Sequence, residues 1–231
     1  MTRMTGLIAA LDTTDPQRAR RWASQVAPSC GMLKLGLEFF LANGAEGVRL
    51  IDDRPIFLDL KLHDIPNTVA GGVRAILPLK PTFLTLHAGG GRAMIGAARD
   101  AAEAAGADRP KLLAVTVLTS LDAEALHEVG VAGGPRQQVL RLARLALDAG
   151  ADGIVCSAHE IATLRAALGP EALLVVPGIR PAGSDAGDQA RTMTPREAAE
   201  AGADWLVVGR PITAAADPAA AAAAIAADLV A

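Results

Sequence analysis

The stretch AGADGIVCS at residues 149–157 is matched in outline by the stretch AGADWLVVGR at residues 201–210. Each begins with a glycine-containing segment of the kind that ends a helix and continues as a short apolar run of the kind that forms a strand. The repeat therefore predicts a unit in which a helix leads directly into a buried strand. Working outward from these two copies, the same alternation of helix and strand can be followed along the whole chain.

Eight apolar runs of this kind recur in the sequence. Most of them are apolar at nearly every position rather than at alternate positions, as expected for strands of a parallel sheet that is covered on both faces. The runs span residues 7–12, 32–36, 55–61, 83–88, 111–118, 153–157, 173–179 and 205–210.

Segments with helical periodicity separate these runs. The first begins with the helix-start signals Asp15 and Pro16, and apolar side chains follow from Ala19 to Val26 with the spacing of one helix face. Eight strand–helix units predict an α/β protein with the (β/α)8 TIM-barrel fold, for which ~250 residues is typical. We expect a single domain over residues 1–231, and an open doubly wound sheet is the structural alternative.

The composition of the 231 residues excludes several classes of protein. Hydrophobic residues make up 51% of the chain, which rules out disorder, and a net charge of −3 provides no positive field for nucleic acid. The apolar run that ends at Asp12 and the alanine-rich segment 218–231 are both too short to cross a membrane. Cys30 and Cys156 lack the spacing of a disulfide framework or a zinc site. These features predict a cytoplasmic protein that binds neither nucleic acid nor membranes.

Polar residues gather where the apolar runs end. In a TIM barrel the active site lies at the carboxyl ends of the strands, so these residues are the candidates for its chemistry. They are Asp12, Lys34, Asp59, Lys61, His87, Thr119, Ser120, Ser157, Pro177, Gly178, Arg180, Gly209 and Arg210.

The densest group of charges is in the sequence DLKLHD at residues 59–64. Because alternate residues of a strand share a face, Asp59 and Lys61 point the same way, and Lys34 at the end of the neighbouring strand can lie beside Asp59. Asp64 is a further candidate for this row of alternating charge. The structural alternative is a buried ion-pair network that fixes strand register, but desolvation makes such a network a costly source of stability. The row therefore favours a functional site.

A second group, at the last two strands, has the residues of a phosphate site. TIM barrels commonly bind phosphate between the loops after strands seven and eight and the start of a short extra helix. The sequence GRP at residues 209–211 offers a close backbone approach, an arginine and a helix-starting proline, with Arg180 and Gln189 nearby. The loop at residues 181–191 has the composition of a flap over a ligand. An ordinary loop followed by a helix start is the alternative, because this pattern alone is weak.

Other kinds of chemistry find little support in the sequence. His87 could act as a general base, although a strand-end histidine is more often hydrogen-bonded within the barrel. No metal-binding spacing, nucleophile elbow or dinucleotide-binding glycine pattern is present. We therefore expect no metal site.

The motif LDLKLHDIPNT at residues 58–68 resembles the signature of the orotidine 5′-phosphate decarboxylase family. The resemblance extends over the whole chain and includes ALD at 10–12, LKLG at 33–36, VLTS at 117–120, PGIR at 177–180, Gln189 and VGRPI at 208–212. It implies a TIM barrel that decarboxylates orotidine 5′-monophosphate without a cofactor. It also implies a homodimer with two shared active sites.

The resemblance implies roles for individual residues as well. Lys61 is implied to be the proton donor, Asp59 the carboxylate next to the departing CO₂, and Lys34 the group that anchors Asp59 and the ribose. Asp64 and Thr68 are implied to reach into the neighbouring subunit's site. The residues implied to contact the ribose, pyrimidine or phosphate are Asp12, Thr119, Ser120, Pro177, Arg180, Gln189, Gly209 and Arg210.

Two alternative functions compete with this interpretation. Sugar-phosphate decarboxylases and aldolases share the D-x-K-x-x-D element and use Mg²⁺, but they are expected to lack the sequence IPNT found here at residues 65–68. A catalytically silent sensor of a phosphate ligand has no use for a costly row of lysines and aspartates. Both considerations favour the nucleotide enzyme.

Overall fold

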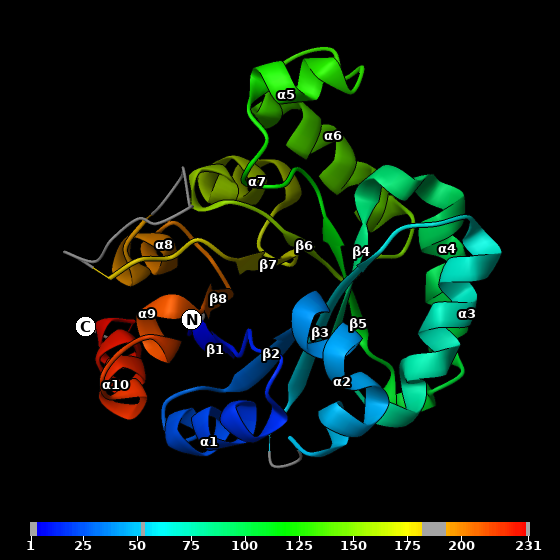
Figure 1. Cartoon of the computed structure of the whole chain (residues 1–231). Coiled ribbons are helices and arrows are strands. Elements are labelled where there is room, and N and C mark those ends of the chain that lie inside the picture. The colour runs from blue at the N-terminus through cyan, green and yellow to red at the C-terminus, as the bar shows by residue number, and fades with distance from the viewer. Residues whose placement is uncertain (1–3, 52–53, 182–192, 230–231) are drawn as a thin grey trace.

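The computed structural model describes residues 4–51, 54–181 and 193–229. Its eight strands are parallel and close into a barrel in chain order, with β8 paired to β1 (Figure 1). This closed barrel confirms the predicted (β/α)8 architecture and excludes the open doubly wound sheet. The strands are β1 (Gly6–Ala10), β2 (Met32–Gly36), β3 (Ile56–Leu62), β4 (Phe83–His87), β5 (Lys111–Val115), β6 (Gly153–Val155), β7 (Leu173–Val176) and β8 (Trp205–Val208).

Helices surround the barrel on its outer side (Figure 1). They are α1 (Pro16–Val26), α2 (Leu37–Arg49), α3 (Pro66–Ile76), α4 (Gly91–Glu103), α5 (Ala123–Glu128), α6 (Pro135–Asp148), α7 (Ile161–Leu168), α8 (Pro195–Glu200), α9 (Arg210–Thr213) and α10 (Pro218–Asp228). α5 projects beyond the ring next to α6, whereas α10 packs against α1 and α9 where the barrel closes. Among the described residues, no helix is long and apolar enough to cross a membrane.

The start of α1 shows how the local sequence sets an element boundary. The Asp15 side chain accepts hydrogen bonds from the backbone N–H groups of Gln17 and Arg18, and Pro16 follows at the first helical position. Ala19 and Val26 are buried in the layer between this helix and the barrel. The predicted start and inner face of this helix are therefore confirmed.

Several strands end earlier than the apolar runs predict. β5 ends at Val115 rather than at residue 118, β7 ends at Val176 rather than at residue 179, and β1, β6 and β8 each end two residues early. Val117 and Ile179 lie beyond these strands but are only 5% and 0% exposed, because they pack between the barrel and its helices. Burial continues beyond the pairing of the barrel strands, and Ile179 pairs instead with Met193 in an isolated bridge. An apolar run therefore overestimates the length of its strand.

Apolar side chains fill the interior of the barrel. Alternate residues of each strand point inward, and the inward residues form a compact cluster of Ile8, Ala10, Met32, Phe57, Phe83, Leu113, Leu173, Val175 and Val207. The ring of Phe83 meets those of Phe57 and Trp205 edge to face, with centroid distances of 5.8 and 6.0 Å. Toward the carboxyl ends of the strands the inward residues become polar, at Lys34 and Asp59.

The two AGAD stretches have matching structures at the amino-terminal ends of the strands. The first glycine of each has a positive φ, 100° in one and 101° in the other, which glycine adopts without strain. The aspartate that follows turns onto the neighbouring strand. Asp152 accepts a hydrogen bond from the Leu112 N–H at 2.8 Å, and Asp204 accepts one from the Leu174 N–H at 2.7 Å. Each stretch therefore ties one strand to the start of the strand beside it.

Arginines complete these two clamps. Arg109 donates two hydrogen bonds to the Asp152 carboxylate at 2.7 and 2.8 Å, and Arg165 Nη2 lies 2.9 Å from Asp204 Oδ2. Burial by itself raises the pKa of Asp152, but the hydrogen bonds from Arg109 and Leu112 hold that pKa below its usual value. Because residues at this end of a TIM barrel serve stability rather than chemistry, we interpret both clamps as structural.

Removal of the buried Asp204 carboxylate should destabilise the fold strongly. Its side chain is only 5% exposed, so Asp204→Ala deprives the Arg165 guanidinium and the Leu174 N–H of a partner inside the protein. We expect the free energy of unfolding in urea to fall by ~3–5 kcal/mol. As a control, Asp228→Ala removes an exposed pair with Arg196 and should lower it by no more than ~1 kcal/mol. Equal losses in the two variants would contradict the clamp.

Candidate active site

Two hollows open side by side at the carboxyl ends of the strands. Lys34, Asp59, Pro177 and Val207 line both hollows, which therefore form one continuous site. The shared wall is built by inward-facing residues of β2, β3 and β8 together with the first residue after β7.

The first hollow, which we call the apolar hollow, has a volume of about 180 Å³. Lys61 and Thr119 face it in addition to the residues of the shared wall. Its other walls are Phe57, Val115, Val117, Leu118, Val155 and Cys156. A largely apolar space with a few polar groups suits a small ring that carries polar substituents.

The second hollow, which we call the polar hollow, is larger, with a volume of about 520 Å³. Arg180 and Arg210 contribute positive charge to its lining, and Asp12 and Glu38 contribute negative charge. The rest of its unshared wall consists of Ala10, Gly178 and Gly209. Two arginines in a concave site suit a phosphate or another multivalent anion.

A row of alternating charges runs along the shared wall. Lys61 Nζ lies 2.8 Å from Asp59 Oδ2, and Lys34 Nζ lies 3.5 Å from the same oxygen. Lys34 Nζ also donates a hydrogen bond to Asp12 Oδ1 at 3.1 Å. The predicted juxtaposition of Lys34, Asp59 and Lys61 is therefore confirmed, and within one chain the row continues to Asp12 rather than to Asp64.

Asp59 is anionic at the centre of this row. Burial by itself raises the pKa of its carboxyl, but the ammonium groups of Lys34 and Lys61 and a hydrogen bond from Thr85 hold that pKa below its usual value. The side chains of Lys34 and Asp59 are 11% and 13% exposed, whereas that of Lys61 is 30% exposed. Lys61 is thus the cation of the row that is most accessible to a ligand in the apolar hollow.

The backbone at Lys61 is strained. Its φ angle is +49°, in the left-handed region, which costs a non-glycine residue about 1–3 kcal/mol. The pairing of β3 with β4 also shifts between Leu58 and Leu62. Such strain is typical of functional positions, because the surrounding structure must hold the residue in place.

Thr85, on β4, is a site residue that the sequence patterns did not predict. Its hydroxyl donates a hydrogen bond to Asp59 Oδ1 at 2.9 Å and accepts one from the Lys61 backbone N–H at 2.9 Å. Its side chain is completely buried. The available signal was a hydroxyl two residues after Phe83, at an inward position of the strand FLTLH where an apolar residue is expected.

Asp64, Thr68 and Ser120 lie outside both hollows. All three are exposed, and Asp64 Oδ1 accepts a hydrogen bond from the Ile65 backbone N–H at 2.6 Å. Within the described part of the chain, Asp64 forms no ion pair. The structure therefore does not add Asp64 to the charge row of its own chain, because β3 has ended and the backbone is already turning into α3.

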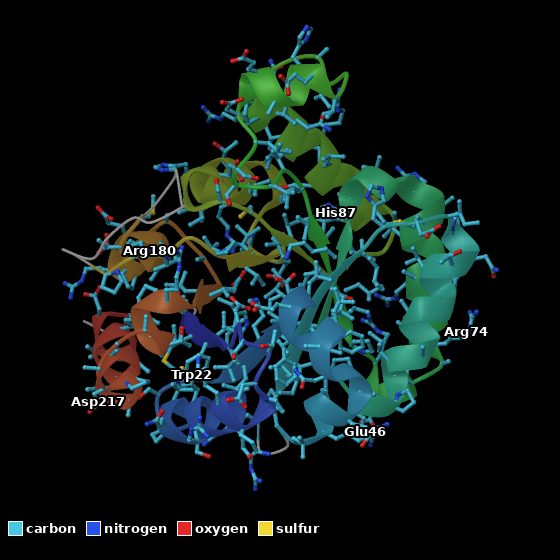
Figure 2. The ribbon with its side chains drawn as sticks, in the orientation of Figure 1. Trp22, Glu46, Arg74, His87, Arg180 and Asp217 are labelled. Carbon is cyan, nitrogen blue, oxygen red and sulfur yellow. The ribbon has the colours of Figure 1, made fainter. Side chains whose placement is uncertain are left out.

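Three of the residues predicted to bind phosphate, Arg180, Gly209 and Arg210, line the polar hollow. Pro177, predicted as a substrate contact, lines both hollows. Gln189 lies outside the described residues, as does the predicted flap at 181–191 apart from its first residue. Arg180 Nη1 donates a hydrogen bond to the Ile179 carbonyl at 2.9 Å. Figure 2 shows Arg180 near α8, well separated from His87 at the end of β4.

The histidine at the end of β4 does not belong to the site. His87 lines neither hollow, and its half-buried ring lies next to that of His63, with a centroid distance of 5.3 Å. Burial, and then the nearby His63 and Lys61, lower the pKa of His87 despite the opposing charge of Asp59. A packed, neutral histidine agrees with a structural role. Among the residues that the structure describes, no group of three or more His, Cys, Asp or Glu side chains could hold a metal ion.

Comparison with known proteins places this arrangement in a family. Residues 5–225 match the model of the Orotidine 5'-phosphate decarboxylase / HUMPS family. The chain belongs to this family. The match includes all eight strands and every described residue of the two hollows.

Two curated orotidine 5′-phosphate decarboxylases are identical to the chain at more than half of the aligned positions. The orotidine 5′-phosphate decarboxylase of Gluconobacter oxydans is 58% identical over 229 residues, which are 97% of each chain. That of Anaeromyxobacter sp. strain K is 57% identical over 225 residues, which are 96% of this chain and 97% of the relative. The similarity thus extends over the whole barrel and is not confined to the charged motif.

Solved structures of the family have the same barrel. Orotidine 5′-phosphate decarboxylase from Lactobacillus acidophilus superposes with a TM-score of 0.88 at 40% identity and covers 98% of this chain and 100% of that chain. Orotidine 5′-phosphate decarboxylase from Pyrococcus horikoshii superposes with a TM-score of 0.79 at 24% identity, and the match covers 97% of this chain and 99% of that chain. The second comparison bears on the fold alone.

Proposed function

We propose that the chain is an orotidine 5′-phosphate decarboxylase, which converts orotidine 5′-monophosphate into uridine 5′-monophosphate and CO₂ in pyrimidine biosynthesis. The observation that carries the proposal is the row of Lys34, Asp59 and Lys61 on a wall shared by an apolar and a polar hollow. The apolar hollow suits a pyrimidine ring, and the polar hollow suits a phosphorylated ribose. The activity named for the relatives supports the same assignment.

The reaction makes a demand that fixed charge can meet. When the bond between C6 of the pyrimidine and the carboxylate breaks, CO₂ leaves and the electron pair stays on C6. The ring offers no electron sink for that pair, so stabilisation must come from charges already in place. The ammonium group of Lys61 can stabilise the carbanion and then give C6 its proton. The proposed enzyme therefore works without a cofactor.

In this proposal Asp59 has two tasks. Its carboxylate lies 2.8 Å from the Lys61 ammonium, so it holds the proton donor in position. We also place Asp59 next to the departing CO₂, where its negative charge disfavours the bound carboxylate relative to the transition state. The burial of Asp59 strengthens both effects, because charges interact more strongly away from water.

The remaining contacts follow the two hollows. We assign Lys34 and Asp12, which are hydrogen-bonded to each other, to the ribose hydroxyls. Thr119 and its neighbour Ser120 are assigned to the pyrimidine, since Thr119 lines the apolar hollow. Arg180, Gln189, Gly209 and Arg210 are assigned to the phosphate, and Pro177, which lines both hollows, is a further substrate contact.

We also propose that the active enzyme is a homodimer in which Asp64 and Thr68 act in the neighbouring subunit's site. Both side chains are exposed beyond the end of β3, outside the hollows of their own chain. The large apolar side chains of Leu37, the first residue of α2, and Ile65, the residue before α3, are also exposed at this end of the barrel. Exposed large apolar side chains suit a surface that a partner covers.

The proposal includes one catalytic domain over residues 1–231, working in the cytoplasm. Cys30 and Cys156 are free thiols. Both are buried, and burial raises the pKa of both, to about 12 for Cys30. Unpaired, unreactive cysteines suit a reducing compartment.

Lys61→Ala should abolish turnover of orotidine 5′-monophosphate. The loss should exceed the ~10²–10⁴-fold typical of one general acid, because the charge that stabilises the carbanion disappears as well. Decarboxylation is followed with EDTA present, and the wild-type protein should retain its activity. Lys111→Ala, at an exposed lysine that begins β5, is the control and should also retain activity. A Lys61→Ala variant with a tenth of wild-type activity, or inactivation of the wild type by EDTA, would overturn the proposal.

Mixing two inactive variants tests the shared site. A Lys61→Ala subunit and an Asp64→Ala subunit form a heterodimer in which one site has both intact residues. Random exchange of subunits should restore roughly a quarter of wild-type activity, since half of the dimers are mixed and each has one working site. Native mass spectrometry verifies the exchange. Failure to recover activity in verified heterodimers would show that Asp64 does not act across the interface.

Arg210→Ala tests the phosphate assignment. Loss of a charge-assisted contact to a dianion should lower kcat/KM for orotidine 5′-monophosphate by about 100-fold or more. The same variant should match the wild type on orotidine, which has no phosphate for Arg210 to bind. Arg74→Ala, an exposed arginine in the last turn of α3, is the control for loss of an arginine. An equal loss on both substrates would assign Arg210 to the fold or to the base site instead.

A further inference from the structure

Thr85 is the one residue of β4 that faces an irregular stretch of β3. The two strands pair regularly at Leu58 with Leu84, and they pair again at Leu62 with Leu86. Between these points β3 advances by four residues and β4 by only two, so β3 carries two extra residues opposite Thr85. Both Asp59 and Lys61 lie within this irregular stretch.

The hydroxyl of Thr85 bonds to both of these residues at once. It accepts a hydrogen bond from the Lys61 N–H and donates its own hydrogen to Asp59 Oδ1, each at 2.9 Å. A threonine hydroxyl has a single hydrogen to donate, so these two bonds define its orientation fully. The side chain is completely buried, which keeps water from competing for either bond.

The bond to Asp59 determines which carboxylate oxygen meets the lysines. Because Thr85 occupies Oδ1, the other oxygen, Oδ2, faces Lys61 at 2.8 Å and Lys34 at 3.5 Å. The bond to the Lys61 N–H supports a backbone whose φ of +49° is otherwise unfavourable. One hydroxyl therefore holds both the carboxylate and the main chain from which the lysine extends.

We infer that Thr85 is a positioning residue for catalysis, which sets the geometry of Asp59 against Lys61 without touching the substrate. This inference rests on the proposed decarboxylase function. The purely structural alternative is that the hydroxyl only satisfies two buried polar groups, so that its loss changes stability and leaves the folded enzyme fully active.

The charged groups around Asp59 allow the two roles to be separated by pH. Lys34 faces Asp59 from β2 and Lys61 from β3, while Asp12 pairs with Lys34 and His87 lies further along β4. The Thr85 hydrogen bond is one of the interactions that lower the pKa of Asp59. Without this hydrogen bond the pKa of Asp59 rises. On acidification, Asp59 therefore loses the ionised form that the mechanism uses at a higher pH than in the wild type.

The test compares Thr85→Val, which removes the hydroxyl at nearly constant volume, with Thr85→Ser, which keeps it. Thr116→Val is the matched control, because Thr116 is also a buried threonine and its hydroxyl, within the described residues, bonds only to the Val155 carbonyl. For each variant we measure kcat and KM for orotidine 5′-monophosphate, the pH dependence of kcat and the thermal unfolding midpoint. The NMR chemical shift of the Asp59 carboxyl carbon, measured as a function of pH, reports the protonation of this group without depending on activity. The Asp59→Asn variant identifies its signal.

We expect Thr85→Val to lower kcat by about 10- to 100-fold, with a smaller change in KM, and to move the acid limb of the pH profile to higher pH. Thr85→Ser should stay within about threefold of the wild type, and Thr116→Val should lose stability but keep kcat. The Asp59 carboxyl should titrate at higher pH in Thr85→Val than in Thr85→Ser.

Two results lead to different conclusions. If Thr85→Val has wild-type kcat and an unchanged Asp59 titration, the inference is wrong, whether or not stability falls. If the wild-type protein does not decarboxylate orotidine 5′-monophosphate while the Asp59 titration still shifts in Thr85→Val, the positioning of Asp59 stands and the proposed function fails.

Discussion

The buried negative charge of Asp59 is the constraint around which the mouth of the barrel is built. A carboxylate that is only 13% exposed needs nearby compensation, and three strands provide it through Lys34 on β2, Lys61 on β3 and Thr85 on β4. Each of these partners then needs its own support, which Asp12 gives to Lys34. The resulting network joins the two hollows, so the same charges that balance Asp59 also form the wall between them.

This network is separated from the parts of the barrel that stabilise it. The apolar cluster that includes Phe57 and Phe83 lies beneath the charges, and the Asp152 and Asp204 clamps lie at the opposite ends of the strands. The buried charges at the mouth lower the stability of the fold, and the packing and ion pairs elsewhere in the chain offset this loss. This arrangement leaves the loops at the mouth free to vary in sequence without loss of the fold.

The fold and the charge row could be predicted because both depend on short-range pattern. Continuous apolar runs report burial on both faces, and the two-residue period of a strand is enough to place Asp59 and Lys61 on one face. The strand ends could not be predicted, because Val117 and Ile179 remain buried after pairing with the neighbouring barrel strands stops. Thr85 was missed for a different reason. Its role depends on a register shift between two strands, and no local pattern reports such a shift.

The eight contacts between neighbouring strands, or seams, are not all held by the same interactions. The seams β5–β6 and β7–β8 are fastened by the Asp152 and Asp204 clamps, whereas the seam β3–β4 loses regular pairing where β3 carries its extra residues. A folded protein opens locally where its structure is least stable. Amide hydrogens in the most stable elements exchange with solvent only when the whole domain unfolds. Amides next to the two clamps should therefore be among the slowest to exchange, whereas the strained Lys61 lies where a side-chain hydroxyl, that of Thr85, takes the place of regular backbone pairing.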